Sequence, residues 1–331
     1  MDACGLPGGP FRDVRLLPGG TQNLNFRFWR GPREYVLRRP PSHPRATSNK
    51  ALAREATVLA ALVHTEVPHA ALIAYCDDTS VLGGVVFHLT EPVDGVNITV
   101  ELPPGAATDP RPRRRAGFAA VDALARIGMV DYQAAGLTGL GHPEGFLARQ
   151  VPRWRAELDS YERLQGYQTG QLPGVERVAG WLERNCPDTW HTAVMHGDFH
   201  LGNLLFTTAD LRVAAVLDWE MCTIGDPLLD LGRFLAHWPA PGHDMQLSGA
   251  IYNVGGLPSV NELADRYAAV TGRSIDQLPW YLALGCFKLG IILEGTYARA
   301  CAGQADPETG AQLHRTALAL FGRALEVIAG E

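Results

Sequence analysis

Two short segments near the middle of the chain constrain its fold most: residues 196–203, with the sequence HGDFHLGN, and residues 216–220, with the sequence VLDWE. Asp198 stands five residues before Asn203, and Asp218 follows twenty residues after Asp198, at the end of an apolar run. Phosphoryl transfer from a nucleotide needs such a set. One carboxylate accepts the proton of the attacking hydroxyl, while an amide and a second carboxylate hold the magnesium ions that bridge the phosphates. Alone, the tripeptide HGD would indicate only a loop with a buried turn aspartate, so the argument depends on both segments together.

The residues between these segments predict how they meet. Residues 204–206 and 213–217 are apolar and flank the turn sequence Thr208-Ala209-Asp210. This pattern is typical of a β-hairpin. A hairpin here would return Asp218 to the neighbourhood of Asn203.

The motif spacing also supports a family resemblance. H-x-D-x-x-x-x-N resembles the catalytic loop of protein kinases, and Asp218 resembles the metal-binding aspartate of their D-F-G motif. The form here, H-G-D-x-H-x-x-N followed by L-D-W-E, is similar to the aminoglycoside phosphotransferase and choline kinase-like family. Residues 217–232, LDWEMCTIGDPLLDLG, most resemble the kinase-like domains linked to acyl-CoA dehydrogenases and their free-standing bacterial relatives.

The resemblance runs from residue 16 to about residue 305 and implies the fold. We expect an α+β, two-lobed protein-kinase-like fold. A small β-rich nucleotide-binding lobe would cover residues 1–95, and a larger, mostly helical catalytic and substrate-binding lobe would cover residues 96–331.

The same resemblance implies roles for the central residues. Asp198 would be the base or hydroxyl-orienting group, Asn203 and Asp218 would bind Mg²⁺, and His196 would buttress the loop. His200 would have either a substrate-binding or a structural role. Asp226 would cap the following helix, with Pro227 in its first turn, and would brace the catalytic loop.

A glycine-rich hairpin is expected near the N-terminus. Residues 14–17 and 24–28 alternate like strands around the sequence PGGTQN. Read alone this is a hairpin with a flexible turn, and it is not a G-x-G-x-x-G motif. It resembles the shorter loop that covers the nucleotide phosphates in the family. Its candidate contacts are Gly20, Thr21, Gln22 and Asn23.

A third strand, residues 34–39, would carry the phosphate-binding cation. Alternation places Val36 and Arg38 on one face and Leu37 and Arg39 on the other. By resemblance the first face looks onto the nucleotide, and Arg38 takes the position of the phosphate-binding lysine of protein kinases. A helix over residues 49–63, capped by Ser48 or Asn49, would bring Glu55 to pair with it. The alternatives are an edge-strand arginine and a helix glutamate in solvent.

Two further strands, residues 71–75 and 85–90, end in the turn sequence EPVDG. By resemblance this is the hinge, where backbone groups near Glu91 and Val93 meet the base. Helices are expected over residues 118–130, 144–164, 175–185, 226–237, 262–270, 278–302 and 308–328. The basic run Arg113-Arg114-Arg115 is expected to be a solvated helix start.

Net charge, hydropathy and cysteine spacing limit the classes of partner and the cellular location that we expect for the chain. The net charge of −6 does not favour nucleic acid or an anionic membrane. The apolar run at residues 282–293 carries Lys288 and is too short to span a bilayer, and the N-terminus lacks signal-peptide features. The six cysteines form no C-x-x-C pair, so neither zinc nor a disulfide framework is indicated. A cytoplasmic protein is the expectation.

The function expected is transfer of the γ-phosphate of ATP or GTP to a hydroxyl of a small molecule. Polycationic aminoglycosides call for acidic sites, whereas the acids of the terminal helices (Glu262, Asp265, Asp276, Glu294) alternate with bases (Arg266, Arg273, Lys288, Arg299). A hydroxyacyl thioester or similar metabolite is therefore at least as well supported as acceptor. A choline-like acceptor would rely on Trp280, Tyr281 and Tyr297, but such aromatics are more often core.

The alternative to an enzyme is a nucleotide-binding pseudokinase or scaffold without turnover. The intact set of Asp198, Asn203 and Asp218 argues against it.

Overall fold

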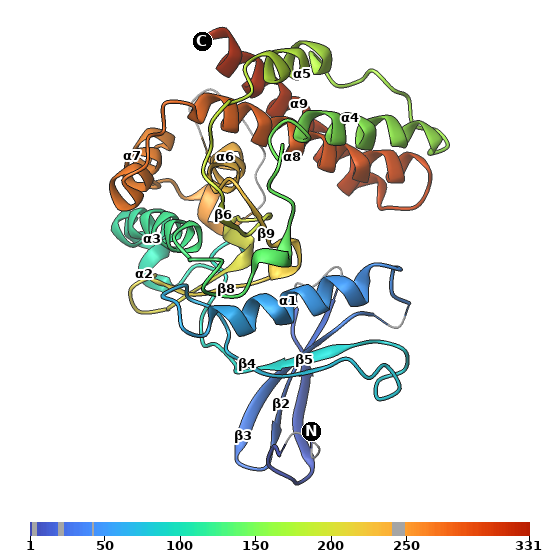
Figure 1. Cartoon of the computed structure of the whole chain (residues 1–331), viewed down its shortest axis with the longest axis vertical. Helices are drawn as coiled ribbons and strands as arrows, with labels where there is room; N and C mark the ends of the chain where they lie inside the picture. The colour runs from blue at the N-terminus through green and yellow to red at the C-terminus, as the bar shows by residue number, and fades with distance from the viewer. Residues whose placement is uncertain (2–4, 19–22, 42, 240–248) are drawn as a thin grey trace.

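The N-terminal part of the chain is a five-stranded sheet with one helix beside it (Figure 1). The computed structural model describes residues 1, 5–18, 23–41, 43–239 and 249–331. The strand order is β1-β2-β3-β5-β4, and neighbouring strands are antiparallel. The elements are β1 (Phe11–Leu16), β2 (Leu24–Arg30), β3 (Arg33–Arg39), α1 (Ser48–Leu62), β4 (Leu72–Cys76) and β5 (Phe87–Thr90).

Strand β3 lies in the middle of this sheet and carries the predicted phosphate-binding residue. Val36 pairs with Thr90, and Arg38 pairs with His88 on β5. Helix α1 buries an apolar stripe at helical spacing, and Glu55 lies within that stripe at 3% exposure. The sheet and the helix therefore bring a buried base and a buried acid to the same side of the lobe.

The beginning of α1 differs from the expectation. Its N-cap is Thr47, which makes no side-chain capping bond. Asn49 instead donates to the carbonyl of Gly84 and accepts from the N–H of Val86, each at 3.3 Å. The predicted cap residue is used to fix the β4–β5 loop, which the local sequence alone could not show.

The rest of the chain is mostly helical, as the sequence predicted. Its helices are α2 (Pro104–Thr108), α3 (Pro110–Gly128), α4 (Gln150–Ser160), α5 (Val175–Arg184), α6 (Leu228–Ala236), α7 (Val260–Thr271), α8 (Leu278–Cys301) and α9 (Pro307–Ala329). Two small antiparallel pairs are embedded among them, β6 (Ala193–Met195) with β9 (Thr223–Gly225), and β7 (Leu204–Phe206) with β8 (Val213–Val216). The fold is α+β and two-lobed.

The hairpin β7–β8 is joined to the chain on both sides. Val96 and Phe206 exchange backbone hydrogen bonds of 2.8 Å, and the N–H of Val216 donates to the carbonyl of Pro68 at 2.8 Å. The segment after β5 and the loop after α1 therefore both contact the hairpin, which is followed directly by Asp218.

Two sequence expectations for the helical part need correction. The helix expected over residues 144–164 is shorter, since α4 covers Gln150–Ser160 and a 3₁₀ turn follows. Arg113 is not solvated. It is 5% exposed, and its guanidinium donates to the carbonyls of Ala106 at 2.6 Å and Gly255 at 2.7 Å. These carbonyls come from α2 and from a distant loop, so a charge run read along the chain could not reveal them.

Among the described residues, one helix, α8, is long and apolar enough to cross a membrane. Protein atoms bury 72% of its apolar window. It packs between α6 and α9 (Figure 1). A single helix of this kind is weak evidence for a membrane span, because a buried core helix passes the same test.

Candidate active site

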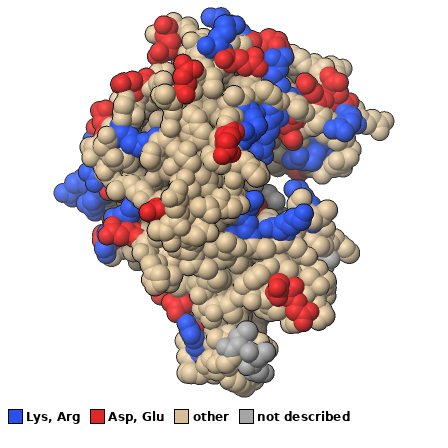
Figure 2. All heavy atoms as spheres, viewed as in Figure 1, with Lys and Arg blue, Asp and Glu red and all other residues tan. Residues whose placement is uncertain are grey.

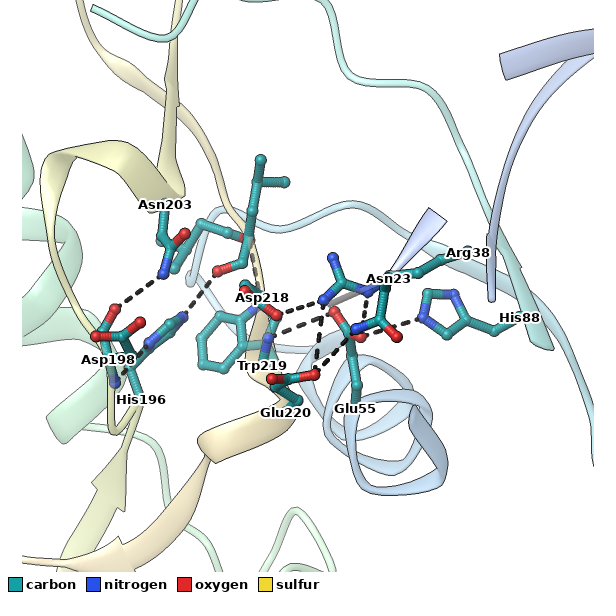
Figure 3. Close-up of polar contacts among 12 residues, drawn as sticks. Asn23, Arg38, Glu55, His88, His196, Asp198, Asn203, Asp218, Trp219 and Glu220 are labelled. Atoms are coloured by element: carbon teal, nitrogen blue, oxygen red, sulfur yellow. Dashed lines mark hydrogen bonds and ion pairs between the residues drawn. The ribbon is translucent and has the colours of Figure 1, made fainter. Parts of the chain in front are cut away.

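The catalytic-loop residues lie together with the end of the hairpin (Figure 3). The Asn203 amide donates to the backbone carbonyl of Asp198 at 3.0 Å. The N–H of Leu217 donates to the carbonyl of Asn203 at 2.8 Å, and the His196 Nε2 atom lies 2.9 Å from the carbonyl of Leu217. These bonds tie the loop of Asp198 and Asn203 to the residue before Asp218. His196 is fully buried, so its ring fills the space beneath this junction.

The backbone conformation and surroundings of Gly197 explain why the HGD motif has a glycine at this position. Its φ is +87°, and a Cβ atom would lie 2.4 Å from the Met221 carbonyl oxygen. Both a left-handed backbone and close contact with the chain after Asp218 are needed here, so a side chain is excluded on two grounds.

The brace of the catalytic loop is Asp230, which corrects the expectation for Asp226. The Asp230 carboxylate accepts from the N–H of His196 at 2.5 Å and from the N–H of Gly197 at 2.9 Å. Helix α6 begins at Leu228 with Pro227 as its N-cap, so Asp226, the predicted cap, lies one residue before the cap position, where it accepts from the N–H of Leu228 at 3.1 Å. Its other partners are Tyr281 at 2.5 Å and Arg273 at 3.1 Å. Asp226 and Asp230 lie about one helical turn apart, so they meet different neighbours.

The carboxylate of Asp198 is held by two bases. The Arg233 Nη2 atom lies 3.3 Å from Oδ1, and the His200 Nε2 atom lies 3.5 Å from Oδ2. Burial would raise the pKa of Asp198, but His200 and Arg233 outweigh it and hold this pKa well below its usual range. The other ring nitrogen of His200 accepts from the N–H of Gly202 at 3.1 Å. His200 therefore has a structural contact and a contact with Asp198.

Arg38 joins both lobes at one point (Figure 3). Its Nε atom lies 2.8 Å from Glu55 Oε2, and its Nη2 atom contacts Asp218 Oδ1. Burial opposes ionisation of Arg38, but Glu55, Asp218 and Glu220 raise its pKa above the ordinary value. Burial likewise opposes ionisation of Glu55, while Arg38 lowers its pKa. The pair is therefore charged.

A cavity of about 150 Å³ lies between the sheet and the hairpin. The predicted nucleotide-binding residues Val36, Arg38, Glu91 and Val93 line it, together with Glu55 and Asp218. The side chain of Asn23, just before β2, donates to Glu220 at 3.0 Å and so ties the end of the glycine-rich turn to the segment after Asp218. The predicted contacts Gly20, Thr21 and Gln22 lie outside the described residues.

Comparison with known proteins agrees with this geometry. The phosphotransferase enzyme family matches the chain over residues 13–263. The chain belongs to this family.

One relative of the chain is acyl-CoA dehydrogenase family member 11 of Gallus gallus, which is 32% identical over 97% of the chain. The match covers 42% of that relative, so the chain spans less than half of its length. A solved Ralstonia eutropha protein assigned to the aminoglycoside phosphotransferases is 30% identical with a TM-score of 0.79, covering 96% of this chain and 94% of that one. A ternary complex of aminoglycoside phosphotransferase APH(4)-Ia with AMP-PNP and hygromycin B shares the fold, at 15% identity, with a TM-score of 0.62 and coverage of 97% and 96%.

A second cavity, of about 290 Å³, lies beside the catalytic loop. Gly197 and Asp230 line it, and so do four cationic residues: Arg54, Arg153, Arg233 and Lys288. Sequence reasoning did not assign Arg233, Glu220 or Lys288 to the site. The sequence did contain a signal for Lys288, because a lysine inside an apolar helical run is rarely buried unless a partner group pairs with it.

The residues present fit a magnesium ion. Asn203 uses its amide nitrogen on Asp198, which leaves its oxygen available, and Asp218 brings a carboxylate that is 35% exposed. Amide and carboxylate oxygens are the ligands that Mg²⁺ takes from proteins. The backbone of Asp218 is left-handed, with φ +67°, a conformation that aspartate tolerates better than most residues.

Proposed function

We propose that the protein is a phosphotransferase that moves the γ-phosphate of ATP or GTP to a hydroxyl of a small molecule, with Mg²⁺. The observation that carries this proposal is the meeting of Asp198, Asn203 and Asp218 beside the Arg38–Glu55 ion pair. Two cavities adjoin these residues: Asp218 lines one, and Gly197, next to Asp198, lines the other. One cavity would take the nucleotide and the other the acceptor, close to Asp198.

Asp198 would accept the hydrogen bond of the acceptor hydroxyl and then its proton. Its lowered pKa keeps the carboxylate ionised at neutral pH, so it can orient the hydroxyl before transfer. Arg233 and His200 hold its two oxygens in place. His196 buttresses the loop from below.

Asn203 and Asp218 would hold the magnesium ion. When bound, this ion would neutralise charge on the phosphate oxygens. Arg38 would pair with the phosphates and Glu55 would orient it, while the loop with Gly20, Thr21, Gln22 and Asn23 would cover them. Val36 and the backbone near Glu91 and Val93 would contact the base. The hinge then falls near residue 95, between lobes of residues 1–95 and 96–331.

The acceptor would be a metabolite rather than a polycation. The acids of the terminal helices have structural partners, since Glu262 binds Ser259 and Arg114, and buried Glu294 binds Tyr167 and His314. The aromatic residues Trp280, Tyr281 and Tyr297 make core contacts. The relative named acyl-CoA dehydrogenase family member 11 supports a hydroxyacyl thioester as one acceptor class to test.

The test is thermal melting with ATP, GTP and Mg²⁺, alone and combined, followed by a screen of hydroxyl acceptors with labelled nucleotide. We expect the combination to raise the melting temperature far more than either component alone, because the ion needs phosphate oxygens to complete its shell. No shift with any nucleotide would remove the proposal. A shift without transfer to any acceptor, or to water, would favour the pseudokinase.

A further inference from the structure

Lys288 on α8 is an unusual residue in this chain. Of the 29 lysines and arginines, only Lys50 and Lys288 are lysines. The Lys288 Nζ atom donates to the carbonyl of Gly197 at 3.1 Å, next to Asp198, and lies 5.4 Å from the centre of the Trp154 ring. An ammonium has three N–H donors. The catalytic loop uses one, and the side chain lines the second cavity.

Close packing of two helices brings Lys288 to this place. A Cβ atom on Gly232 of α6 would lie 2.3 Å from the Tyr281 carbonyl of α8. The two backbones therefore touch, and α8 reaches the catalytic loop alongside Asp230 and Arg233 of α6.

Two residues that line this cavity carry buried donors without acceptors. Trp154 is 8% exposed, and its Nε1 atom has no hydrogen-bond partner in the part of the chain that the structure describes. Arg233 is 7% exposed, and within the same residues its Nε and Nη1 atoms also have none. The Arg153 guanidinium lies 5.3 Å from the centre of the Trp154 ring, so two cations contact one indole. Buried donors without partners cost free energy unless a ligand supplies acceptors.

The carboxylates of this cavity are already engaged. Asp230 accepts from the two backbone N–H groups of the catalytic loop. Glu220 accepts from Asn23 and lies 4.0 Å from Arg38. Among the described residues, neither acid makes a direct ion pair with Lys288 or Arg153, although Asp230 favours the charged form of Lys288 through space. Figure 2 shows Lys and Arg side chains above and below a hollow on the right of the molecule.

We propose that Lys288, Arg233, Arg153 and Trp154 form an oxyanion subsite beside Asp198, which binds a carboxylate or phosphoryl group. Such a group offers several hydrogen-bond acceptors for the unpaired donors, and a negative charge for the cationic residues that line the cavity. The interpretation that this subsite serves the acceptor rests on the proposed function. The binding of an oxyanion to the subsite does not depend on that function. The group has two possible sources: an acid group of the acceptor, or the phosphoryl group once it has been transferred.

The charge state of Lys288 gives this subsite a pH dependence. Burial and then Arg233 lower the pKa of Lys288 to about 8, against the opposing effect of Asp198 and Asp230. Arg153, Arg54 and Glu220 are the other charged residues of the cavity. The ammonium is charged below about pH 8, so oxyanion binding should weaken as the pH rises through this value.

The first experiment measures sulfate binding to the full chain by calorimetry, with and without a saturating non-hydrolysable nucleotide and Mg²⁺. Sulfate keeps its charge across the pH range, so the titration reports on the protein. We expect Lys288→Met to weaken sulfate binding about tenfold or more, as for loss of a charge-assisted bond. The matched control is Lys50→Met, at the exposed second lysine on α1, which should change nothing.

Two further variants keep the test valid if Lys288→Met does not fold. Trp154→Phe keeps an aromatic ring but removes the N–H, and should weaken sulfate about threefold. Lys288→Arg should bind sulfate without the loss above about pH 8. Absence of sulfate binding overturns the subsite. So does binding that is unchanged in both Lys288→Met and Trp154→Phe, or that is competed by nucleotide and lost in Arg38→Ala.

The source of the group is decided by turnover of hydroxy acids paired with their primary amides. If the acceptor carries the anion, wild-type kcat/KM favours acids over amides and Lys288→Met removes that preference. If the transferred phosphoryl group is bound, Lys288→Met lowers kcat equally for acids and amides. If no phosphate is transferred to any acceptor, the proposed function is wrong. The sulfate measurement still decides separately whether the subsite exists.

Discussion

The Nε atom of Arg38 lies 2.8 Å from Glu55 Oε2, and the Nη2 atom of the same guanidinium contacts Asp218. One side chain of β3 thus joins an acid of α1 to an acid that follows the hairpin of the other lobe. Two different nitrogen atoms make the two contacts. The planar guanidinium directs these donors along fixed directions, whereas an ammonium is a compact point charge.

Arg38→Ala should therefore be severe. It removes charge-assisted contacts, each typically about 1.5–3 kcal/mol, which corresponds to roughly a ten- to hundredfold loss of nucleotide binding or rate. The effect of Arg38→Lys should lie between that of Arg38→Ala and none, since lysine keeps a charge for the phosphates but lacks the planar fork that contacts Glu55 and Asp218. The measurement is nucleotide affinity together with kcat.

Arg39→Ala is the matched control, since its guanidinium donates to the carbonyl of Pro40 and it does not line the cavity. It should leave nucleotide affinity nearly unchanged. Damage from Arg39→Ala with a harmless Arg38→Ala would contradict the assignment of Arg38.

Asp198→Asn should abolish transfer and leave nucleotide affinity within about threefold, because its carboxylate faces Arg233 and His200 rather than the Arg38 cluster. Asp218→Asn should instead weaken binding of the magnesium–nucleotide complex. Equal loss of nucleotide binding in both variants would show that the two roles are wrongly divided.

The sequence could predict the fold and the pairing of segments because these depend on local patterns. The alternation of β3 placed Val36 and Arg38 on one face, and the hairpin returned Asp218 to Asn203; these two need only the period of a strand and one short connection. The pairing of Arg38 with Glu55 came from the family resemblance.

What could not be predicted depends on how packed helices are rotated. Asp226 and Asp230 both belong to the segment GDPLLDLG, and only the packing of α6 against the loop decides which one holds it. Arg113 donates a hydrogen bond to the carbonyl of Gly255, which is distant from it in the sequence. Lys288 meets Gly197 only because α6 and α8 touch at a glycine. No period in the sequence contains this information.

Asp230→Asn tests the corrected brace. The carboxylate accepts from two backbone N–H groups with two oxygens, and an amide offers one oxygen and an N–H₂ that would face a donor. We expect a loss of about 1–3 kcal/mol in the free energy of unfolding and a fall in kcat of at least tenfold. Urea unfolding and steady-state kinetics provide both quantities.

The control for this variant is Asp226→Asn, which is also buried but bonds to Tyr281 and Arg273 rather than to the loop. It should lower stability by a similar amount while kcat per folded molecule is largely kept. If Asp226→Asn damaged kcat and Asp230→Asn did not, the assignment of the brace to Asp226 that the sequence suggested would be right.

His237 should make the protein sensitive to acid. Burial and the nearby Arg233 and His200 lower the pKa of this imidazole to about 3, and its Nδ1 atom has no hydrogen-bond partner among the described residues. The folded protein keeps the ring neutral, whereas the unfolded chain protonates it below about pH 6.5. The unfolded state therefore binds more protons between these two values, so stability is full above about pH 6.5 and falls as the pH drops toward 3. The variant His237→Gln has no imidazole at this position, so this contribution to acid sensitivity should disappear.

In urea unfolding between about pH 7 and pH 4, the wild type should lose up to about 1 kcal/mol more of its free energy of unfolding than the variant for each pH unit. Parallel curves for the two proteins would mean that His237 is protonated in the folded state, and that another group accounts for any acid unfolding.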